Sequence, residues 1–268
     1  MTMVNVDVAH GAEFDLTDEL VVAKFRTLAE SGYFDGGHGG PPCSTWSVVR
    51  FKPGGPGPLR FRDSPWGRDE LSPQDQRRVD DANRILVATM MILKAIVKSG
   101  GFASLEHPRD PGTHPYPSIW NLSIMQNWEE ECGMERTHFL QCMWGCMAPK
   151  ATTITSNVPG ISDLCVPCNH TRHLQKLHGV DASGKFRSRT TQAYPTQLCQ
   201  KIASVFIASF KNDEERGANR LLDDAYLDHV ITKMDDMTTT EITLSSPSPR
   251  KTHQMTMGIP DNFLRAQG

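Results

Sequence analysis

GGPPCSTWS, at residues 39–47, combines two glycines, two prolines and a cysteine in one short segment. It follows Tyr33-Phe34-Asp35, an apolar start that predicts a short strand. Two glycines allow the backbone to turn and to approach a ligand closely, and two prolines then restrict φ. Cys43 is therefore predicted to lie on a stiff loop, and a thiol presented in this way suits nucleophilic chemistry. The alternative is a small buried apolar Cys in a tight turn.

The chain of 268 residues can hold one α/β domain and a C-terminal tail. Its net charge is -3, with 28 Lys and Arg against 31 Asp and Glu, so a DNA-binding surface would have to be local. Seven cysteines in no regular framework favour reduced thiols inside a cell, in the nucleus or the cytoplasm. We find no secretory signal and no apolar run approaching ~18 residues, and we expect an intracellular monomer that does not cross a membrane.

The N-terminal segment alternates apolar and polar residues over positions 3–8, which predicts a strand. A carboxylate near a strand end can accept hydrogen bonds from two ribose hydroxyls, so Asp7 is a candidate cofactor ligand. The equal alternative is a surface Asp at a strand end. Asp15 lies in the next loop, and Thr17 is the expected N-cap of a helix over residues 20–28.

A loop rich in Gly and Pro is expected over residues 51–66, and it either contacts phosphate or is merely solvated. Its cations are Arg50, Lys52, Arg60, Arg62 and Arg68. Ser72 and Pro73 then begin a long helix with an apolar period that ends at Gly100.

Phe102–Pro108 is predicted to be a strand after this helix, with Glu106 near its end. At the carboxyl end of a parallel strand, beside the strand that leads to Cys43, Glu106 would face a ligand; the alternative is a capping or surface Glu. A helix is expected over 118–128, and further strands over 137–143 and 150–157.

Together these segments resemble the motifs of the cytosine-5 DNA methyltransferases over the first three quarters of the chain. GGPPCSTWS resembles the catalytic loop of that family, with Ser44 where Gln is more usual. Glu106-His107-Pro108 resembles the Glu-Asn-Val motif. Lys150 stands where short viral and mobile-element relatives have Lys-Pro-Thr, and residues 191–199 resemble the last motif, Asn-x-Val-Pro before a closing helix.

The resemblance implies a Rossmann-like sheet with flanking helices, as in methyltransferases that use S-adenosyl-L-methionine (SAM). This sheet would be N-terminally incomplete, because the family's Phe-x-Gly-x-Gly loop would lie upstream of Met1. By resemblance, Cys43 attacks carbon 6 of a flipped cytosine, Glu106 holds ring nitrogen 3, and Lys150 supplies positive charge near the base. The candidate cofactor-binding residues are Asp7, Asp15, Pro41 and Tyr194.

A second chemical group lies in Cys165-Val166-Pro167-Cys168-Asn169-His170-Thr171-Arg172-His173. Two thiolates two residues apart on a turn can share a tetrahedral zinc ion, and His170 or His173 can complete the site. Further ligands can come from Cys142, Cys146 or His178. The alternative is a pair of partly buried free thiols.

The expected domain spans residues 1–210 and includes a small basic Cys/His insert over 160–190 that would contact DNA. Residues 211–268 turn acidic and then Ser/Thr/Pro-rich, which predicts a largely disordered tail with a marginal helix over 221–234.

Three functions follow from these residues. The first is SAM-dependent methyl transfer to carbon 5 of cytosine in DNA, through an adduct with the Cys43 thiolate and Glu106. The second is a catalytically dead nucleic-acid-associated module derived from a mobile element. The third is a small zinc-stabilised thiol hydrolase that uses Cys43, with His38 or His107 as its base.

Overall fold

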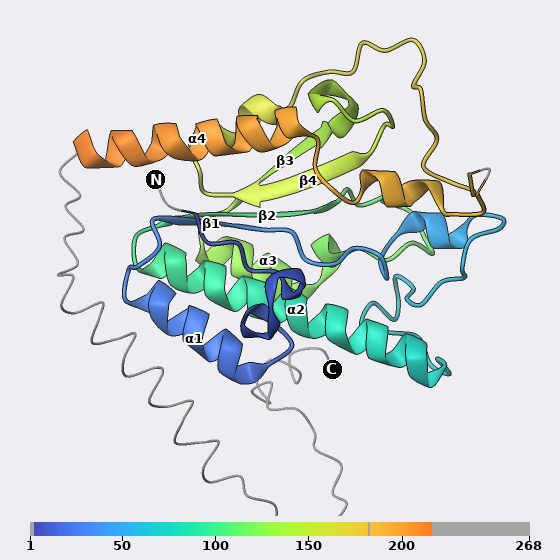
Figure 1. Cartoon of the computed structure of the whole chain (residues 1–268), viewed down its shortest axis with the longest axis horizontal. Helices are drawn as coiled ribbons and strands as arrows, with labels where there is room; N and C mark the ends of the chain where they lie inside the picture. The colour runs from blue at the N-terminus through green and yellow to red at the C-terminus, as the bar shows by residue number, and fades with distance from the viewer. Residues whose placement is uncertain (1–2, 182, 216–268) are drawn as a thin grey trace, which may run out of the picture. The chain divides into compact units, whose positions relative to one another are not determined.

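A mixed four-stranded sheet, in the order β1-β2-β4-β3, forms the centre of the protein (Figure 1). The computed structural model describes residues 3–181 and 183–215, which all fall within one compact unit. The strands are β1 (Gly36–Gly39), β2 (Phe102–Pro108), β3 (Glu135–Leu140) and β4 (Ala151–Ser156). β1 and β2 pair in parallel, and β4 is antiparallel to both of its neighbours. This α/β architecture with flanking helices is compatible with a Rossmann-like fold.

Helices cover both faces of the sheet (Figure 1). The α-helices are α1 (Glu19–Glu30), α2 (Pro73–Lys98), α3 (Ser123–Glu131) and α4 (Thr196–Glu215). α1, α2 and α3 lie on one face, where they form one apolar core, and α4 lies on the other face over a second core. Short 3-10 turns connect these elements: Val8–His10, Ala12–Phe14, Val48–Phe51, Ile119–Asn121, Gln141–Trp144, Ile161–Leu164 and Arg187–Thr191.

α2 is the longest of the described helices, and its start is as the sequence predicted. The Ser72 side chain accepts a hydrogen bond from the backbone amide of Asp75, and Pro73 occupies the first turn. Leu86 and Leu93 on its inner face are almost fully buried in the core on this side of the sheet, and Leu93 packs against the glycines of β1. Each such side chain contributes about 1.5–3 kcal/mol to folding, so packing against the sheet holds this helix in place.

Glycines in β1 allow α2 to lie unusually close to the sheet. A Cβ atom on Gly39 would lie 2.4 Å from Cγ2 of Thr89, and one on Gly37 would lie 2.7 Å from Cδ1 of Ile96. β1 begins at Gly36 rather than in the predicted segment 33–35.

The N-terminal prediction is wrong, because residues 3–8 form no strand. Val8 is 60% exposed, so this segment finds no face of the sheet on which to bury its apolar side chains. Asp7 caps the 3-10 turn that begins at Val8 by accepting a hydrogen bond from the amide of Ala9 at 2.9 Å. The N-cap of α1 is Asp18, not Thr17, because its carboxylate accepts from the amide of Leu20.

The loop after Phe51 is largely irregular, as predicted, but its Arg60 is fully buried. The guanidinium lies over the ring of Trp46, 4.1 Å from the ring centroid. It donates four hydrogen bonds, to Thr45 Oγ1, Pro65 O, Asn83 Oδ1 and Val79 O. Arg60 therefore ties the loop to α2, and the expectation that it contacts phosphate is wrong.

Three other cations of this loop also make local contacts. Arg50 donates to the carbonyl of Gly57 at 2.7 Å, Arg62 forms an ion pair with Asp110 at 3.6 Å, and Lys52 lies over the ring of Tyr116. Arg68 is exposed.

The remaining predicted elements are found with shifted ends. The strand expected over 137–143 ends at Leu140, and the segment over 118–128 is a 3-10 turn followed by α3. α4 extends past residue 210 to Glu215. The predicted tail beyond that point, with its helix over 221–234, lies outside the described residues. Within the described chain, no helix combines the length and apolarity that a membrane crossing requires.

His107 is almost fully buried on the face of the sheet that carries α1, α2 and α3. Its ring lies edge-on to Trp46 and Trp120, with centroid distances of 6.0 and 6.4 Å. Burial first, and then the charges of Arg60 and Lys150, lowers the pKa of His107 to about 3. The folded protein therefore holds this imidazole neutral at physiological pH.

We expect this neutral His107 to make folding sensitive to acid. The unfolded chain takes up the proton near pH 6.5 and the folded chain only near pH 3, so stability is lost as the pH falls through this window. The loss through this one group is about 2 kcal/mol between pH 7 and pH 5. Urea unfolding of the wild type and of His107→Gln over this range checks it, and the variant should lose less stability. Equal slopes in the two proteins would contradict the assignment.

Candidate active site

One edge of the sheet gathers the predicted chemical residues. Because β1 and β2 are parallel, their carboxyl ends lie at the same edge, which places the Cys43 loop beside Glu106. β4 runs the other way, so it begins at this edge directly after Lys150. β3 ends there, directly before Gln141.

Glu106 is the centre of this group, and only 5% of the residue is exposed. The hydroxyl of Tyr194 donates to its Oε2 at 2.9 Å. On the other oxygen, Nζ of Lys150 lies 3.8 Å from Oε1, and Nε2 of Gln141 lies 3.5 Å away. Gln141 also donates to Oγ1 of Thr152 at 3.0 Å, so side chains from three other segments meet around the carboxyl group of Glu106.

The environment of Glu106 favours its protonated form. Burial raises the pKa of this carboxyl, and the charge of Lys150 and the hydrogen bonds from Tyr194 and Thr152 offset part of that rise. A Glu that keeps its proton to higher pH than usual can donate that proton to a ligand.

Cys43 lies in the same electrostatic environment. Burial raises the pKa of its thiol; the charge of Lys150 acts against this rise and the charge of Glu106 adds to it. The loop also touches the site directly, because a Cβ atom on Gly40 would lie 2.8 Å from the hydroxyl of Tyr194. The structure thus brings Cys43, Glu106 and Lys150 together, with the thiol protonated in the free protein.

Gln141 is a site residue that the sequence did not single out. It is fully buried, and among the described residues its Oε1 has no hydrogen-bond partner. An unpaired buried acceptor is costly, so a ligand that brings an N–H group to it would gain that interaction. The predicted strand over 137–143 placed Gln141 inside the strand, whereas β3 ends one residue before it.

The residues expected to bind SAM do not form a set of free polar groups. Asp7 caps its own turn, and the carboxylate of Asp15 accepts from the amide and the hydroxyl of Thr17. The hydroxyl of Tyr194 is used by Glu106, and Pro41 is buried in the loop before Cys43. Asp7 and Asp15 thus use one carboxylate oxygen each within their own turns, and the binding of SAM by these four residues stays a prediction.

The two histidines proposed as bases for Cys43 have other neighbours. Nδ1 of His38 lies 2.7 Å from Oγ of Ser104, and its Nε2 lies 3.4 Å from the hydroxyl of Tyr194. His107 points to the opposite face of the sheet, against Trp46. No hydrogen bond joins either imidazole to Cys43 in the described residues, so the geometry does not favour a thiol hydrolase.

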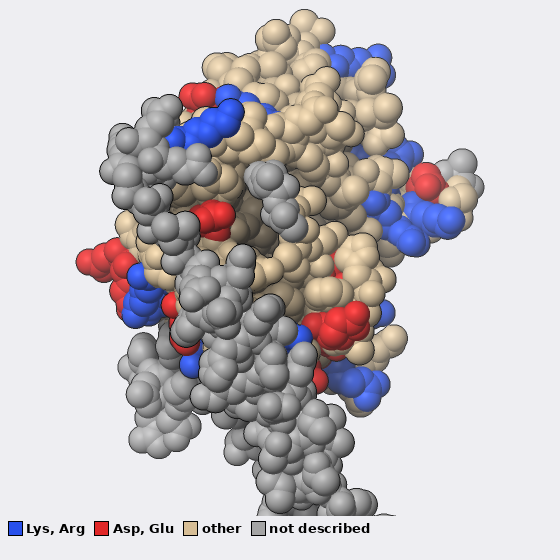
Figure 2. Space-filling model, turned by 60° about the vertical axis from the view of Figure 1, so that its left-hand side comes forward, with Lys and Arg blue, Asp and Glu red and all other residues tan. Residues whose placement is uncertain are grey.

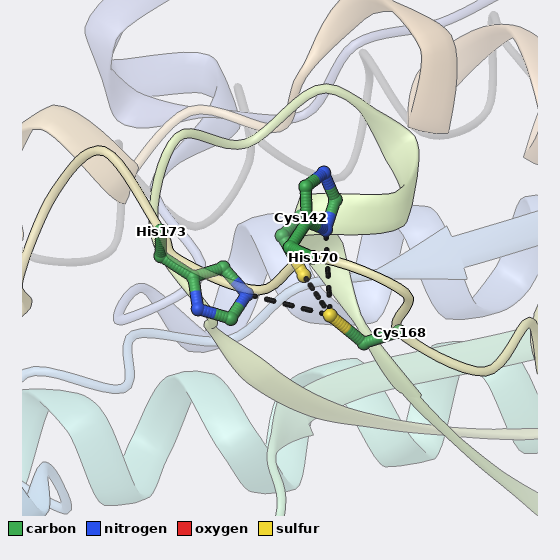
Figure 3. A group of neighbouring side chains, drawn as sticks. All are labelled: Cys142, Cys168, His170 and His173. Carbon is green, nitrogen blue, oxygen red and sulfur yellow. Dashed lines mark hydrogen bonds between the residues drawn. The ribbon is translucent and has the colours of Figure 1, made fainter.

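A separate Cys/His group lies beside this edge (Figure 3). It consists of Cys142, Cys168, His170 and His173, with the candidate ligand atoms all within 4.8 Å of one another. Cys142 directly follows Gln141, and it takes the place that the sequence assigned to Cys165. Cys165 is exposed and lies outside the group.

The segment that carries this group is also locally basic. Its exposed Lys and Arg residues are Arg172, Lys176, Lys185, Arg187 and Arg189. Figure 2 shows one face of the molecule, on which Lys and Arg side chains stand in separate groups on both sides, with Asp and Glu side chains among them. Local cations of this kind can meet phosphate despite the net negative charge of the chain.

Comparison with protein-family models, with curated proteins and with solved structures gave no significant match for this chain, so its function is inferred from the geometry of the site.

Proposed function

We propose that the site at the ends of β1 and β2 captures a cytosine-type base of DNA through a covalent bond to Cys43, as the base-binding centre of a cytosine-5 methyltransferase-like protein. The observation that carries this proposal is the convergence of three groups: a buried carboxyl at Glu106, a thiol at Cys43, and the Lys150 ammonium acting on both. A pyrimidine needs this combination, because its ring must be polarised before a thiol can add to it.

Each group has a defined task in this chemistry. The protonated Glu106 donates to ring nitrogen 3, and the free Oε1 of Gln141 suits the exocyclic amino group. The Cys43 Sγ–C6 bond forms as the C5=C6 pair shifts to C4=C5 and the C4=N3 pair moves onto nitrogen 3. Nitrogen 3 takes the proton of Glu106, and the thiol proton leaves to water. Lys150 favours the thiolate and stabilises the carboxylate that remains.

In this adduct carbon 5 has become nucleophilic, which is the state that methylation of carbon 5 requires. The chemistry of the described residues ends there, and the transfer of a methyl group from SAM to carbon 5 is the part of the proposal that SAM binding has to test. The thiol must approach carbon 6 from above the ring plane, so the base has to leave the stack of a duplex or come from a single strand. The exposed cations from Arg172 to Arg189 can hold the flanking phosphates.

Covalent capture can be tested with a single-stranded oligonucleotide that carries 5-azacytosine, whose carbon 6 is more electrophilic than that of cytosine. We expect a protein–DNA adduct on denaturing electrophoresis and by intact mass, with the cross-link mapped to Cys43. Cys43→Ser should form none. Cys199→Ser, which alters an exposed thiol on α4, is the matched control and should react like the wild type. An adduct that persists in Cys43→Ser would refute the assignment.

The second candidate function is a nucleic-acid-associated module without catalysis. It is favoured by the raised pKa of the Cys43 thiol and by the local use of Asp7 and Asp15. For such a module, the azacytosine strand would bind with a strong dependence on salt but without a covalent bond. Calorimetry with SAM separates the two further, since a module of this kind should release no heat.

A further inference from the structure

We propose that Cys142, Cys168, His170 and His173 bind one zinc ion in a closed tetrahedral site, which anchors the basic segment after β4 to the end of β3. The ligand set differs from the one that the local Cys165–Cys168 spacing indicates, because one thiolate comes from a distant part of the chain. The proposal is independent of the chemistry at Cys43.

The distances within the group match the edges of a zinc tetrahedron. Sγ of Cys168 lies 3.6 Å from Sγ of Cys142, 3.3 Å from Nδ1 of His170 and 3.4 Å from Nε2 of His173. With Zn–S about 2.3 Å and Zn–N about 2.0–2.1 Å, a tetrahedron has S–S edges of about 3.8 Å and S–N edges of about 3.6 Å. All ligand atoms lie within 4.8 Å of one another, so one ion can reach all four (Figure 3).

The chemistry of the donors selects the metal. Two thiolates and two imidazoles are the ligands of structural zinc, and the group contains no carboxylate of the kind that Mg²⁺ or Ca²⁺ requires. Four protein ligands fill the tetrahedron, so this metal would have no open position for substrate. Its role is therefore to hold two segments together.

The segment that supplies three of the ligands has few other supports. Between the 3-10 turn that ends at Leu164 and the one that begins at Arg187, the described residues form no helix and no strand beyond an isolated bridge, Val180 to Phe186, and the amide of Gln175 donates to the carbonyl of Met147 at 3.1 Å. Most of its side chains are exposed. A segment that buries so little apolar surface is held only weakly by packing, and metal binding can supply the missing free energy.

The anchored segment leads directly into the site described above. Near its far end, the carbonyl of Thr191 accepts from Nζ of Lys150 at 3.2 Å, and Tyr194 donates to Glu106. The fourth ligand, Cys142, comes from the turn after β3, where its neighbour Gln141 also contacts Glu106. The metal would thus restrain the two segments from which Gln141 and Tyr194 contact the carboxyl group of Glu106.

Metal content is the direct test. We expect the full chain, purified under reducing conditions without chelators, to contain about one zinc ion per molecule by elemental mass spectrometry. Cys142→Ser and His173→Ala should each lose most of it, whereas Cys165→Ser should keep it. Loss of zinc in Cys165→Ser together with retention in Cys142→Ser would overturn the ligand set. A wild type without metal, or with a Cys142–Cys168 disulfide in its place, would overturn the site.

Two further measurements keep the test decisive if Cys142→Ser folds poorly. Cobalt added to chelator-treated wild type and Cys165→Ser should give, in both, the intense visible bands of tetrahedral thiolate ligation, and their absence would refute the site. Chelation should also accelerate tryptic cleavage after Arg172, Lys176 and Arg187 by about ten-fold or more. The circular dichroism signal of the helices should be retained, because the sheet and its helices do not depend on the metal. Unchanged cleavage would show that the metal does not anchor this segment.

Discussion

Replacing Glu106 with Gln is expected to abolish covalent capture of the base while making the Cys43 thiol more acidic. Gln cannot transfer a proton to ring nitrogen 3, so the rate of capture should fall by about 10²-fold or more. In its ionised form Glu106 raises the pKa of Cys43, and Gln has no ionised form, so the replacement lowers that pKa. The two readouts move in opposite directions, and a merely structural Glu106 would not produce this split.

The rate of capture is measured with the azacytosine strand, and the thiol pKa by the pH dependence of Cys43 alkylation with iodoacetamide, followed by mass spectrometry. Lys150→Met provides the opposite case, because loss of its charge raises the pKa of Cys43. Lys201→Met is the control and should change neither readout. Lys201 lies on α4 and forms an ion pair with Asp163 at 3.0 Å. Capture within a few-fold of wild type in Glu106→Gln would show that the carboxyl does not polarise the base.

Replacing Arg60 with Met is expected to destabilise the fold by about 3–5 kcal/mol, because several acceptors around the buried guanidinium lose their donor at once. Met retains much of the volume over Trp46, but the carbonyls of Pro65 and Val79 and the amide oxygen of Asn83 lose their donors. Each buried acceptor left unpaired costs about 1–3 kcal/mol. A loss of this size would remove much of the stability of an ordinary domain.

Urea unfolding followed by Trp fluorescence measures this loss. Arg68→Met, at an exposed position of the same loop, is the matched control and should stay within about 0.5 kcal/mol of wild type. If Arg60→Met instead kept its stability and weakened DNA binding with a smaller salt dependence, Arg60 would be a phosphate contact after all.

The sequence predicted best where a structure depends on neighbouring residues. α2 carries its own start at Ser72-Pro73 and an apolar period that continues for many turns. β2 was recognisable as an apolar run between Gly101 and Pro108. The strand expected over residues 3–8 failed because alternation shows only that a segment can pair, and in the structure its Val8 lies exposed.

The sequence by itself determined the chemical character of the site: a thiol on a stiff loop after one strand, and a carboxyl at the end of the next. Only the tertiary structure decided which residues surround them. Gln141 and Tyr194 contact Glu106 although they lie 35 and 88 positions away in the sequence. Cys142, 26 positions before Cys168, lies beside its thiol, whereas the nearby Cys165 does not belong to the group. Local spacing carries no information about such contacts, because they arise from the antiparallel course of β4 and the return of the chain before α4. The burial of Arg60 was hidden for the same reason, since its four acceptors come from three separate segments.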